Sequence, residues 1–200
     1  MSQIRHDPHA DIHALIAQRW SPRAFDASRL VDDASLTSLL EAARWAPSCF
    51  GDEPWRILVG NRFENEAAWQ LMLSILAEKN QLWAKHAPVL LLVCADTQFR
   101  QNGKPNRWAQ YDTGAAAVSL CLQAVACGLS AHQMGGFDVE KARQFFGVPE
   151  QFTPMSVIAV GHQADAETLD EDFRQIEEAP RKRREPESLF YTGGHWPEEE

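Results

Sequence analysis

Closely spaced cysteines are missing from this sequence. Its four cysteines form no CxxC pair and no regular framework: Cys49, Cys94, Cys121 and Cys127. The seven histidines are scattered, and none stands at metal-ligand spacing from a cysteine or a carboxylate. Disulfide-rich scaffolds and zinc sites both depend on such spacing. We therefore expect reduced thiols, a cytoplasmic location and no metal ion.

Long apolar runs and an excess of basic residues are also missing. The longest apolar run, residues 114–129, includes Ser119 and Gln123 and is shorter than the roughly 20 residues of a membrane-spanning helix. The first twenty residues lack the apolar core of a secretory signal. Acidic residues outnumber basic ones by 28 to 19, for a net charge of −9. This balance argues against nucleic acid or a membrane as a partner.

Several familiar motifs of enzymes are absent as well. The chain contains no GxGxxG, no P-loop, no GxSxG and no HExxH. Rossmann-type dinucleotide binding, P-loop hydrolysis, serine-elbow chemistry and zinc proteolysis therefore have no support in the sequence. No side chain is assigned as a catalytic acid, base or nucleophile.

Apolar spacing predicts helices that alternate with a few strands. The expected helices span residues 7–19, 33–46, 64–76, 113–127 and 138–146. The expected strands span residues 55–59, 88–94 and 155–160. The continuous apolar run PVLLLVC in the second strand is typical of a strand buried on both faces. The pattern predicts one α+β domain over residues 1–200, with an extended C-terminal arm over residues 165–200.

Two segments bear on partners and ligands. The helix at 113–127 is apolar nearly all round, as expected of a helix that is buried centrally or against a partner subunit. The polar stretch at 97–111 contains Gly103 and Pro105 and is expected to form a long loop of the kind that covers functional sites.

Basic residues form two small groups far apart in the sequence. Arg19, Ser21 and Arg23 lie in RWSPRAF, and residues 181–184 read RKRR. Guanidinium and hydroxyl groups on one turn can hold a phosphate through charge-assisted hydrogen bonds. In an acidic protein, two such groups suggest that they meet around one anion. The alternative for each is a solvated surface charge.

Two further segments combine glycines and small residues. APSCFGDEPW at 46–55 can bring backbone close to a planar ligand, and HQMGGFD at 132–138 can do so through Gly135 and Gly136. Each could instead be an ordinary connection between elements. His132 is interpreted as a hydrogen-bonded polar residue rather than a catalytic base, and Cys49 as a small apolar filler.

Six motifs, in this order, resemble those of the FMN-dependent nitroreductase family, which are NAD(P)H-dependent flavin oxidoreductases. They are RWSPRAF (19–25), AARWAPSCFGDEPWRILV (42–59), AEKNQLWAKHAPVLLLV (77–93), DTGAAAVSLCLQAVACGLSAHQMGGFD (112–138), AVGH (159–162) and RKRREPESLFY (181–191). The resemblance covers nearly the whole chain. It implies an α+β fold with a central, mostly antiparallel sheet flanked by helices. It also implies a homodimer that exchanges C-terminal arms and binds two FMN molecules at the subunit interface.

The resemblance assigns roles to the two basic groups and to one amide. Arg19, Ser21 and Arg23 match the contacts to the FMN phosphate, ribityl chain and ring edge. Arg181 and Arg183 match the C-terminal phosphate clamp.

The remaining implied contacts concern the flavin ring. Asn80 matches the amide that reaches its pyrimidine edge. The segment that lies against the ring, with a backbone N–H aimed at the reactive nitrogen, corresponds to Gln133, Met134, Gly135 and Gly136. The stretch offered by the other subunit corresponds to Pro47, Ser48 and Cys49.

The implied activity is transfer of hydride from NAD(P)H through FMN to a small-molecule acceptor, such as a nitroaromatic or a quinone, by a ping-pong mechanism. The alternatives are a non-catalytic flavin-binding protein, or a reductive dehalogenase or flavin-modifying member of the same superfamily. Many members carry Asn and Gln where this chain has Gly51 and Glu53, a departure that bears on which acceptor is used.

Overall fold

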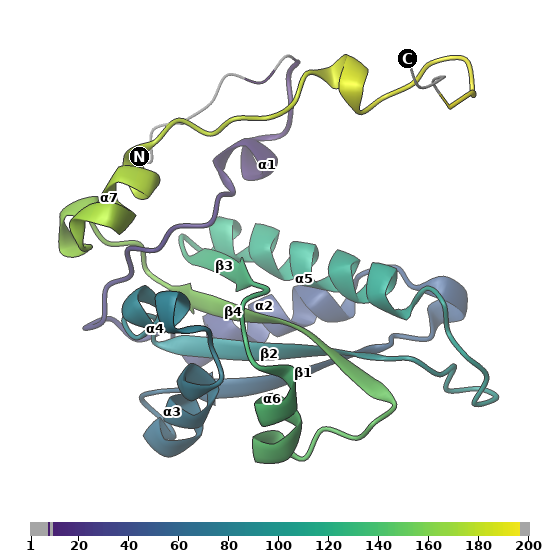
Figure 1. Cartoon of the computed structure of the whole chain (residues 1–200), viewed down its shortest axis with the longest axis horizontal. Coiled ribbons are helices and arrows are strands. Elements are labelled where there is room, and N and C mark those ends of the chain that lie inside the picture. The colour runs from purple at the N-terminus through teal and green to yellow at the C-terminus, as the bar shows by residue number, and fades with distance from the viewer. Residues whose placement is uncertain (1–7, 9, 197–200) are drawn as a thin grey trace.

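A four-stranded antiparallel sheet with strand order β1-β2-β4-β3 forms the centre of the computed structural model (Figure 1), which describes residue 8 and residues 10–196. The strands are β1 (Trp55–Asn61), β2 (Val89–Asp96), β3 (Ser130–Met134) and β4 (Phe152–Gly161). Every residue of β2 is buried, as the apolar run predicted. The pairing of β2 with β4 shifts register between Val93 and Cys94.

Helices cover both faces of this sheet (Figure 1). They are α1 (Ala14–Gln18), α2 (Asp33–Arg44), α3 (Glu66–Ser74), α4 (Glu78–Ala84), α5 (Ala109–Ala126), α6 (Val139–Phe146) and α7 (Glu171–Glu178). Short 3-10 turns lie at η1 (Cys49–Gly51), η2 (Ala166–Thr168) and η3 (Pro186–Ser188). None of the described helices is long and apolar enough to cross a membrane.

The core divides into two clusters because successive side chains of a strand point to opposite faces. Leu91 and Val93 of β2 pack on one face in a cluster with residues of α2 and α5, such as Leu120. Leu90 and Leu92 face the other way, into a cluster with residues of α3, α4 and α6. The expected α+β fold, an antiparallel sheet flanked by helices, is confirmed.

Caps explain where several helices begin and end. The Asp32 side chain accepts a hydrogen bond from the backbone N–H of Ser35 at the start of α2. The Asp138 side chain does the same for Lys141 at the start of α6. Gly147 ends α6 with φ of 61°, a left-handed conformation that favours glycine. The expected helix at 138–146 therefore agrees with the structure within one residue.

Two expected helix starts were wrong. The first helix was expected from Asp7 and Pro8, but Asp7 lies outside the described residues and α1 begins only at Ala14. There the ring of His13 accepts from Leu15 N. The long central helix begins at Ala109 rather than at 113, so the predicted loop at 97–111 ends earlier. The side chain of Asn106 accepts from the N–H of Trp108 and turns the chain into the helix.

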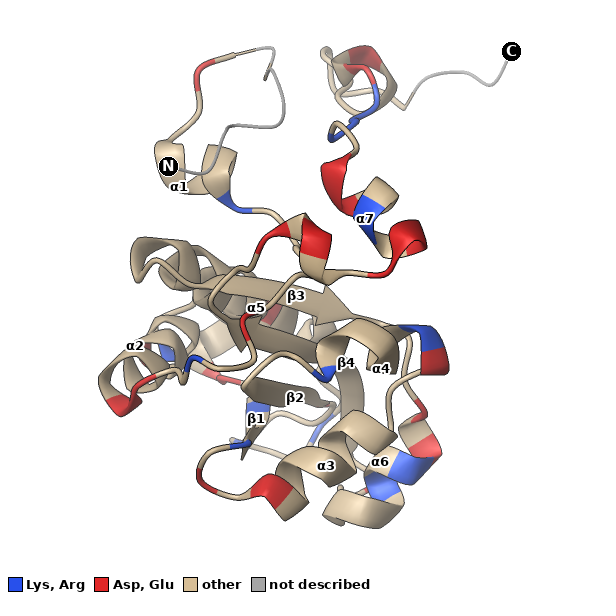
Figure 2. Ribbon diagram, turned by 90° about the vertical axis from the view of Figure 1, so that its left-hand side faces the viewer, with Lys and Arg blue, Asp and Glu red and all other residues tan. Residues whose placement is uncertain are grey.

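Three elements were missed. β3 is short and lies at the sheet edge, and polar residues interrupt its apolar pattern. α4 was not predicted. The expected extended arm at 165–200 contains α7, which is rich in acidic residues (Figure 2), and its sequence offers few apolar residues to signal a helix. Beyond α7, the chain runs along the side of the molecule that carries α1 (Figure 1).

Candidate functional site

Residues from both ends of the chain line one cavity of about 340 Å³. Its basic and hydroxyl groups come from the segment after α1 and from the segment after α7: Arg19, Ser21, Arg23, Arg181 and Arg183. The rest of the lining is Trp20, Ile176, Ala179 and Pro180. The structure thus brings together the two basic groups that the sequence separates. The volume of the cavity falls in the range of small-molecule binding sites.

The local fold holds the first basic segment rigidly. Arg19 is the residue that follows the last residue of α1, and its guanidinium donates to the Ser21 hydroxyl at 3.3 Å. The Pro22 carbonyl oxygen lies 2.9 Å from Nδ1 of His132 on β3. On the other side, the Glu177 carboxylate accepts hydrogen bonds from the backbone N–H groups of Arg23 and Ala24. The segment is therefore held between the sheet and α7.

Like charges face one another around this cavity. The pKa of the Arg181 guanidinium is lowered, first by burial and then by the positive charges of Arg19 and Arg183. No acidic residue is among the described residues that line the cavity. An anion placed there would relieve this repulsion and accept several charge-assisted hydrogen bonds. The cavity is therefore suited to a phosphate or another compact anion.

His132 lies beside this cavity as a neutral imidazole. Burial is the main cause that lowers its pKa from 6.5 to about 4, and the positive charges of Arg23 and Arg19 add to the effect. Its ring centroid lies 4.5 Å from that of Trp83. Because the Pro22 carbonyl is an acceptor, Nδ1 carries the proton. This agrees with the interpretation of His132 as a hydrogen-bonded polar residue.

Asn80 and Gly136 are in direct contact next to β3. The Asn80 side-chain amide donates to the Gly136 carbonyl at 3.0 Å, and the N–H of Ala77 donates to the same oxygen at 2.9 Å. A Cβ on Gly136 would lie 3.0 Å from Asn80 Nδ2, whereas one on Gly135 would meet nothing within 4 Å. A side chain at 136 would therefore have to displace the Asn80 amide slightly, and neither glycine has positive φ.

The two residues before these glycines differ in exposure. Gln133 is exposed, and its amide lies 3.4 Å from Sγ of Cys121 on α5. Met134 is buried, with a relative exposure of 3%, and its side chain packs in the core cluster on the α3 side. Met134 can therefore offer a ligand only its backbone.

The structure does not bring Pro47, Ser48 and Cys49 to the arginine cavity of the same chain. The N–H of Cys49 donates to the Asp112 carboxylate at 2.9 Å, in the first turn of α5. Cys121, which contacts Gln133, is nine residues further along the helix, or about 14 Å at 1.5 Å per residue. In Figure 1 the start of α5 and α7 lie at opposite sides of the molecule.

Buried acids that the sequence did not single out hold loops in place by accepting backbone and side-chain hydrogen bonds. Asp112 caps the turn at Cys49. Asp52 accepts from the N–H of Arg100 and from the side chain of Asn106, which fixes the loop that precedes α5. Glu177 was missed because it lies within a run of acidic residues that reads as solvated. No signal in the sequence separated these carboxylates from the exposed ones.

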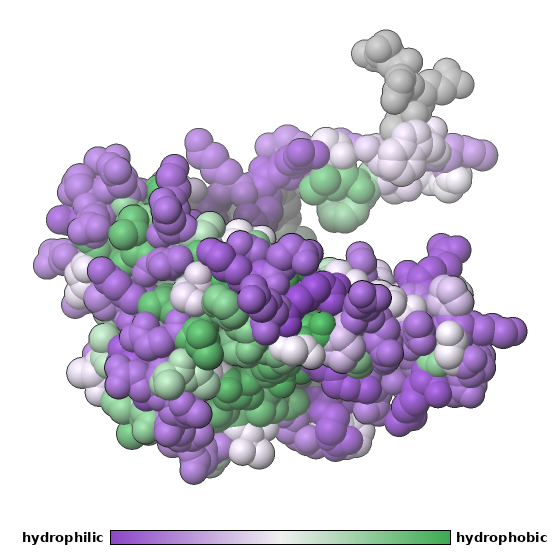
Figure 3. All heavy atoms as spheres, turned by 60° about the horizontal axis from the view of Figure 1, so that its bottom comes forward, coloured by the Kyte–Doolittle hydropathy of each residue, from purple (hydrophilic) through white to green (hydrophobic). Residues whose placement is uncertain are grey.

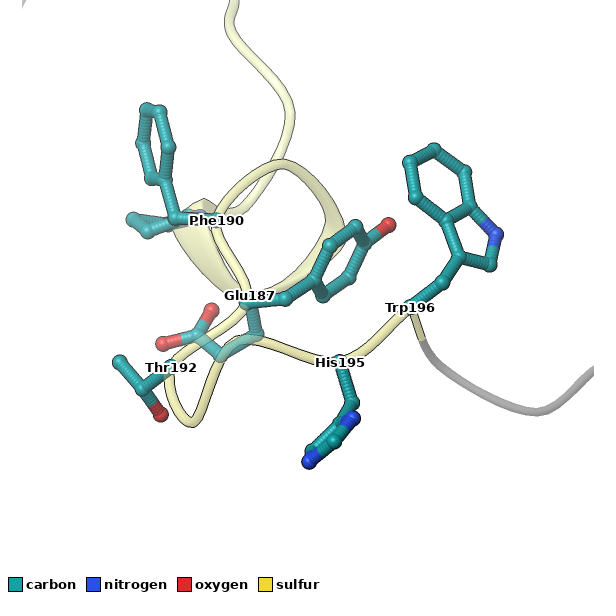
Figure 4. A pocket seen from close by; sticks show the side chains of 7 residues that line it. Glu187, Phe190, Thr192, His195 and Trp196 are labelled. Atoms are coloured by element: carbon teal, nitrogen blue, oxygen red, sulfur yellow. The ribbon is translucent and has the colours of Figure 1, made fainter.

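A second hollow, of about 590 Å³, lies entirely within the C-terminal arm (Figure 4). Residues between Pro186 and Trp196 alone line it. Its aromatic side chains are exposed, at 71% for Phe190 and 81% for Trp196. A patch of hydrophobic residues on the arm stands clear of the body in Figure 3. One short segment does not enclose a ligand, so this hollow is not the candidate site.

Comparison with known proteins gives consistent similarities. The sequence model described as "Nitroreductase family" matches residues 16–162. A protein of Methanothermobacter thermautotrophicus, named "Putative NADH dehydrogenase/NAD(P)H nitroreductase", is 31% identical over 161 residues, which cover 78% of each chain.

Solved structures share the fold. One described as "the oxidoreductase containing FMN" superposes with a TM-score of 0.89 at 32% identity, over 96% of this chain and 97% of that one. A nitroreductase family protein from Clostridium difficile has a TM-score of 0.68 at 24% identity, over 90% of this chain and 96% of that one. The second similarity concerns the fold alone.

The low pKa of His132 predicts a pH-dependent stability. Between pH 6.5 and about 4 the unfolded chain binds a proton that the native imidazole does not, so stability falls as the pH drops through this window. The expected loss is about 3 kcal/mol at pH 4. Urea unfolding from pH 8 to pH 4 measures it. His132→Asn keeps an N–H donor near the position of Nδ1 but does not titrate. Its free energy of unfolding should therefore change less with pH than that of the wild type. Parallel curves for the two proteins would contradict the assignment.

Proposed function

Because this chain belongs to the nitroreductase family, we propose that it is an FMN-dependent oxidoreductase that takes its electrons from NAD(P)H. The observation that carries the proposal is the cavity where Arg19, Arg23, Arg181 and Arg183 converge with Ser21. A further support is the solved relative that contains FMN, at 32% identity over 96% of this chain.

The residues present fit the parts of FMN. The arginines and the Ser21 hydroxyl would hold its phosphate and the adjoining ribityl chain. β3 lies next to this cavity, since Nδ1 of His132 is 2.9 Å from the carbonyl oxygen of Pro22 and the charges of Arg19 and Arg23 lower the pKa of His132. The backbone from Gln133 to Gly136 and the Asn80 amide would hold the ring beyond it. This assignment places the phosphate and the ring on neighbouring elements.

When bound there, FMN would supply the two-electron chemistry that links NAD(P)H oxidation to reduction of a nitroaromatic, a quinone or a similar acceptor in a ping-pong reaction. The protein would bind FMN, orient it and set the charge around it. We assign no side chain as an acid or base. The low pKa of His132 keeps its ring neutral at working pH, so that it holds the Pro22 carbonyl and does not deliver a proton.

We also propose that the active form is a homodimer in which the arms are exchanged. Pro47, Ser48 and Cys49 lie far from the cavity of their own chain, as expected if they complete the site of the other subunit. Exposed apolar residues form a stripe along α5 that includes Tyr111 and Val118. The apolar arm residues likewise need a surface to cover them.

Reduction of the bound flavin tests the activity. The purified protein is expected to be yellow, and NADPH or NADH added without oxygen should bleach the flavin absorbance. A later addition of a nitroaromatic or quinone should restore it. A yellow protein that never bleaches would contradict the oxidoreductase and favour a non-catalytic flavin-binding protein.

Single substitutions test the phosphate assignment. Arg19→Ala or Arg183→Ala should weaken FMN binding about tenfold or more, because hydrogen bonds to charged groups contribute roughly 1.5–3 kcal/mol each. The double variant should lose less than the sum, since both residues contact one group. Fluorescence titration of FMN measures this. Arg184→Ala is the matched control, because Arg184 does not line the cavity. Unchanged affinity in both single variants would refute the assignment.

A charge on the α5 stripe tests the dimer. Val118, which is 49% exposed in the single chain, should be covered in the dimer, so Val118→Glu should shift sedimentation from dimer to monomer. Leu71→Glu on α3 is the control, because Leu71 is 43% exposed on the opposite face and should not alter assembly. A wild-type protein that sediments as a monomer with flavin bound would rule out the shared site.

A further inference from the structure

Glu177 is a fully buried carboxylate that lies outside the lining of the cavity. Its relative exposure is 0%, and it is the buried residue of α7. Both of its carboxylate oxygens accept from the backbone N–H of Arg23, at 3.1 and 2.9 Å. Oε1 also accepts from the N–H of Ala24, at 3.2 Å. These contacts join two segments more than 150 positions apart in the sequence.

Packing alone does not explain a carboxylate at this position. Burying a charged group is costly unless hydrogen bonds replace its lost water. An apolar side chain would avoid that cost, but it would leave the N–H groups of Arg23 and Ala24 without this acceptor. The carboxylate adds a geometric constraint, because its charge-assisted hydrogen bonds to backbone N–H groups depend on distance and angle. Glu177 therefore fixes the position of the Arg23 backbone relative to α7.

This fixed position matters because both joined segments carry the walls of the cavity. Arg23 lines it from one side, and Arg181 and Arg183 follow α7 on the other. His132 holds the preceding Pro22 carbonyl from the sheet side. A change in the distance between α7 and Arg23 would therefore separate the two groups of arginines.

We propose that Glu177 is a positioning residue for anion binding, one that sets the spacing of the two arginine groups around the phosphate. The proposal rests on the function proposed above. The positioning role and a simple charge effect predict opposite changes in anion affinity when Glu177 is replaced. A negative charge near an anion site repels the anion, so its removal alone would strengthen binding. Loss of positioning weakens binding.

The test compares three ligands in two variants. Glu177→Gln keeps the length of the side chain but loses the charge and one acceptor, and Glu177→Asp keeps the charge but loses the reach. Dissociation constants are measured for FMN, for riboflavin, which lacks the phosphate, and for inorganic phosphate. FMN and phosphate should bind about tenfold more weakly in both variants, while riboflavin should bind as in the wild type.

Glu178→Gln is the matched control. Glu178 is the next residue of α7, its side chain is 52% exposed, and its carboxylate pairs with Arg174 at 3.2 Å. This variant removes a negative charge from the same helix without touching Arg23. It should leave the ratio of FMN to riboflavin affinity unchanged, which separates positioning from charge.

Each other outcome has a definite meaning. Equal losses for FMN and riboflavin, or a lower melting temperature with an unchanged ratio, would overturn positioning in favour of a purely structural role. Tighter FMN binding would overturn it in favour of charge. If the wild type binds phosphate but not FMN, the proposed function fails. The phosphate affinities of the variants then test the role of Glu177 by themselves. Binding of neither ligand overturns both. If Glu177→Gln does not fold, Glu177→Asp gives the same comparison.

Discussion

The mutual repulsion of guanidinium groups around one cavity is the constraint on which the site depends. Burial and then the positive charges of Arg19 and Arg183 lower the pKa of the Arg181 guanidinium. Side chains with these charges would separate if they were free to move. They remain together because the backbone that carries them is fixed. The Pro22 carbonyl is held by His132, and the N–H groups of Arg23 and Ala24 are held by Glu177. Preorganised positive charge of this kind favours an anion over water.

The sheet makes this arrangement possible. β2 and β4 form a doubly covered centre, which leaves β3 at an edge next to the N-terminal segment. An edge strand offers backbone groups that a neighbouring strand does not use, and the glycines after β3 keep side chains away from them. The positive lining of the cavity also contrasts with the net charge of −9 of the whole chain.

The single chain leaves several surfaces without a partner. Val118 on α5 and the aromatic residues of the arm are exposed, and the turn at Cys49 is held far from the arginines by Asp112. The proposed homodimer would account for these separate observations together. A site shared in this way would couple cofactor binding to assembly, because each half of the site belongs to a different chain.

The sequence by itself determined those elements whose signals are local. The run PVLLLVC is β2, Asp138 and Gly147 bound α6, and the order of the motifs indicates the family. The two basic groups were also visible in the sequence, which suggested that they meet around one anion, and the structure places both at one cavity.

The tertiary structure alone decided which residues are buried and what they contact. Nothing in the run of acidic residues that contains Glu177 distinguishes it from its exposed neighbours, and β3 lacks a regular apolar pattern. Met134 belongs to the core rather than to the cavity lining, and His132 is neutral because it is buried. Burial and pairing depend on contacts between segments that are distant in the sequence, so local propensity does not predict them.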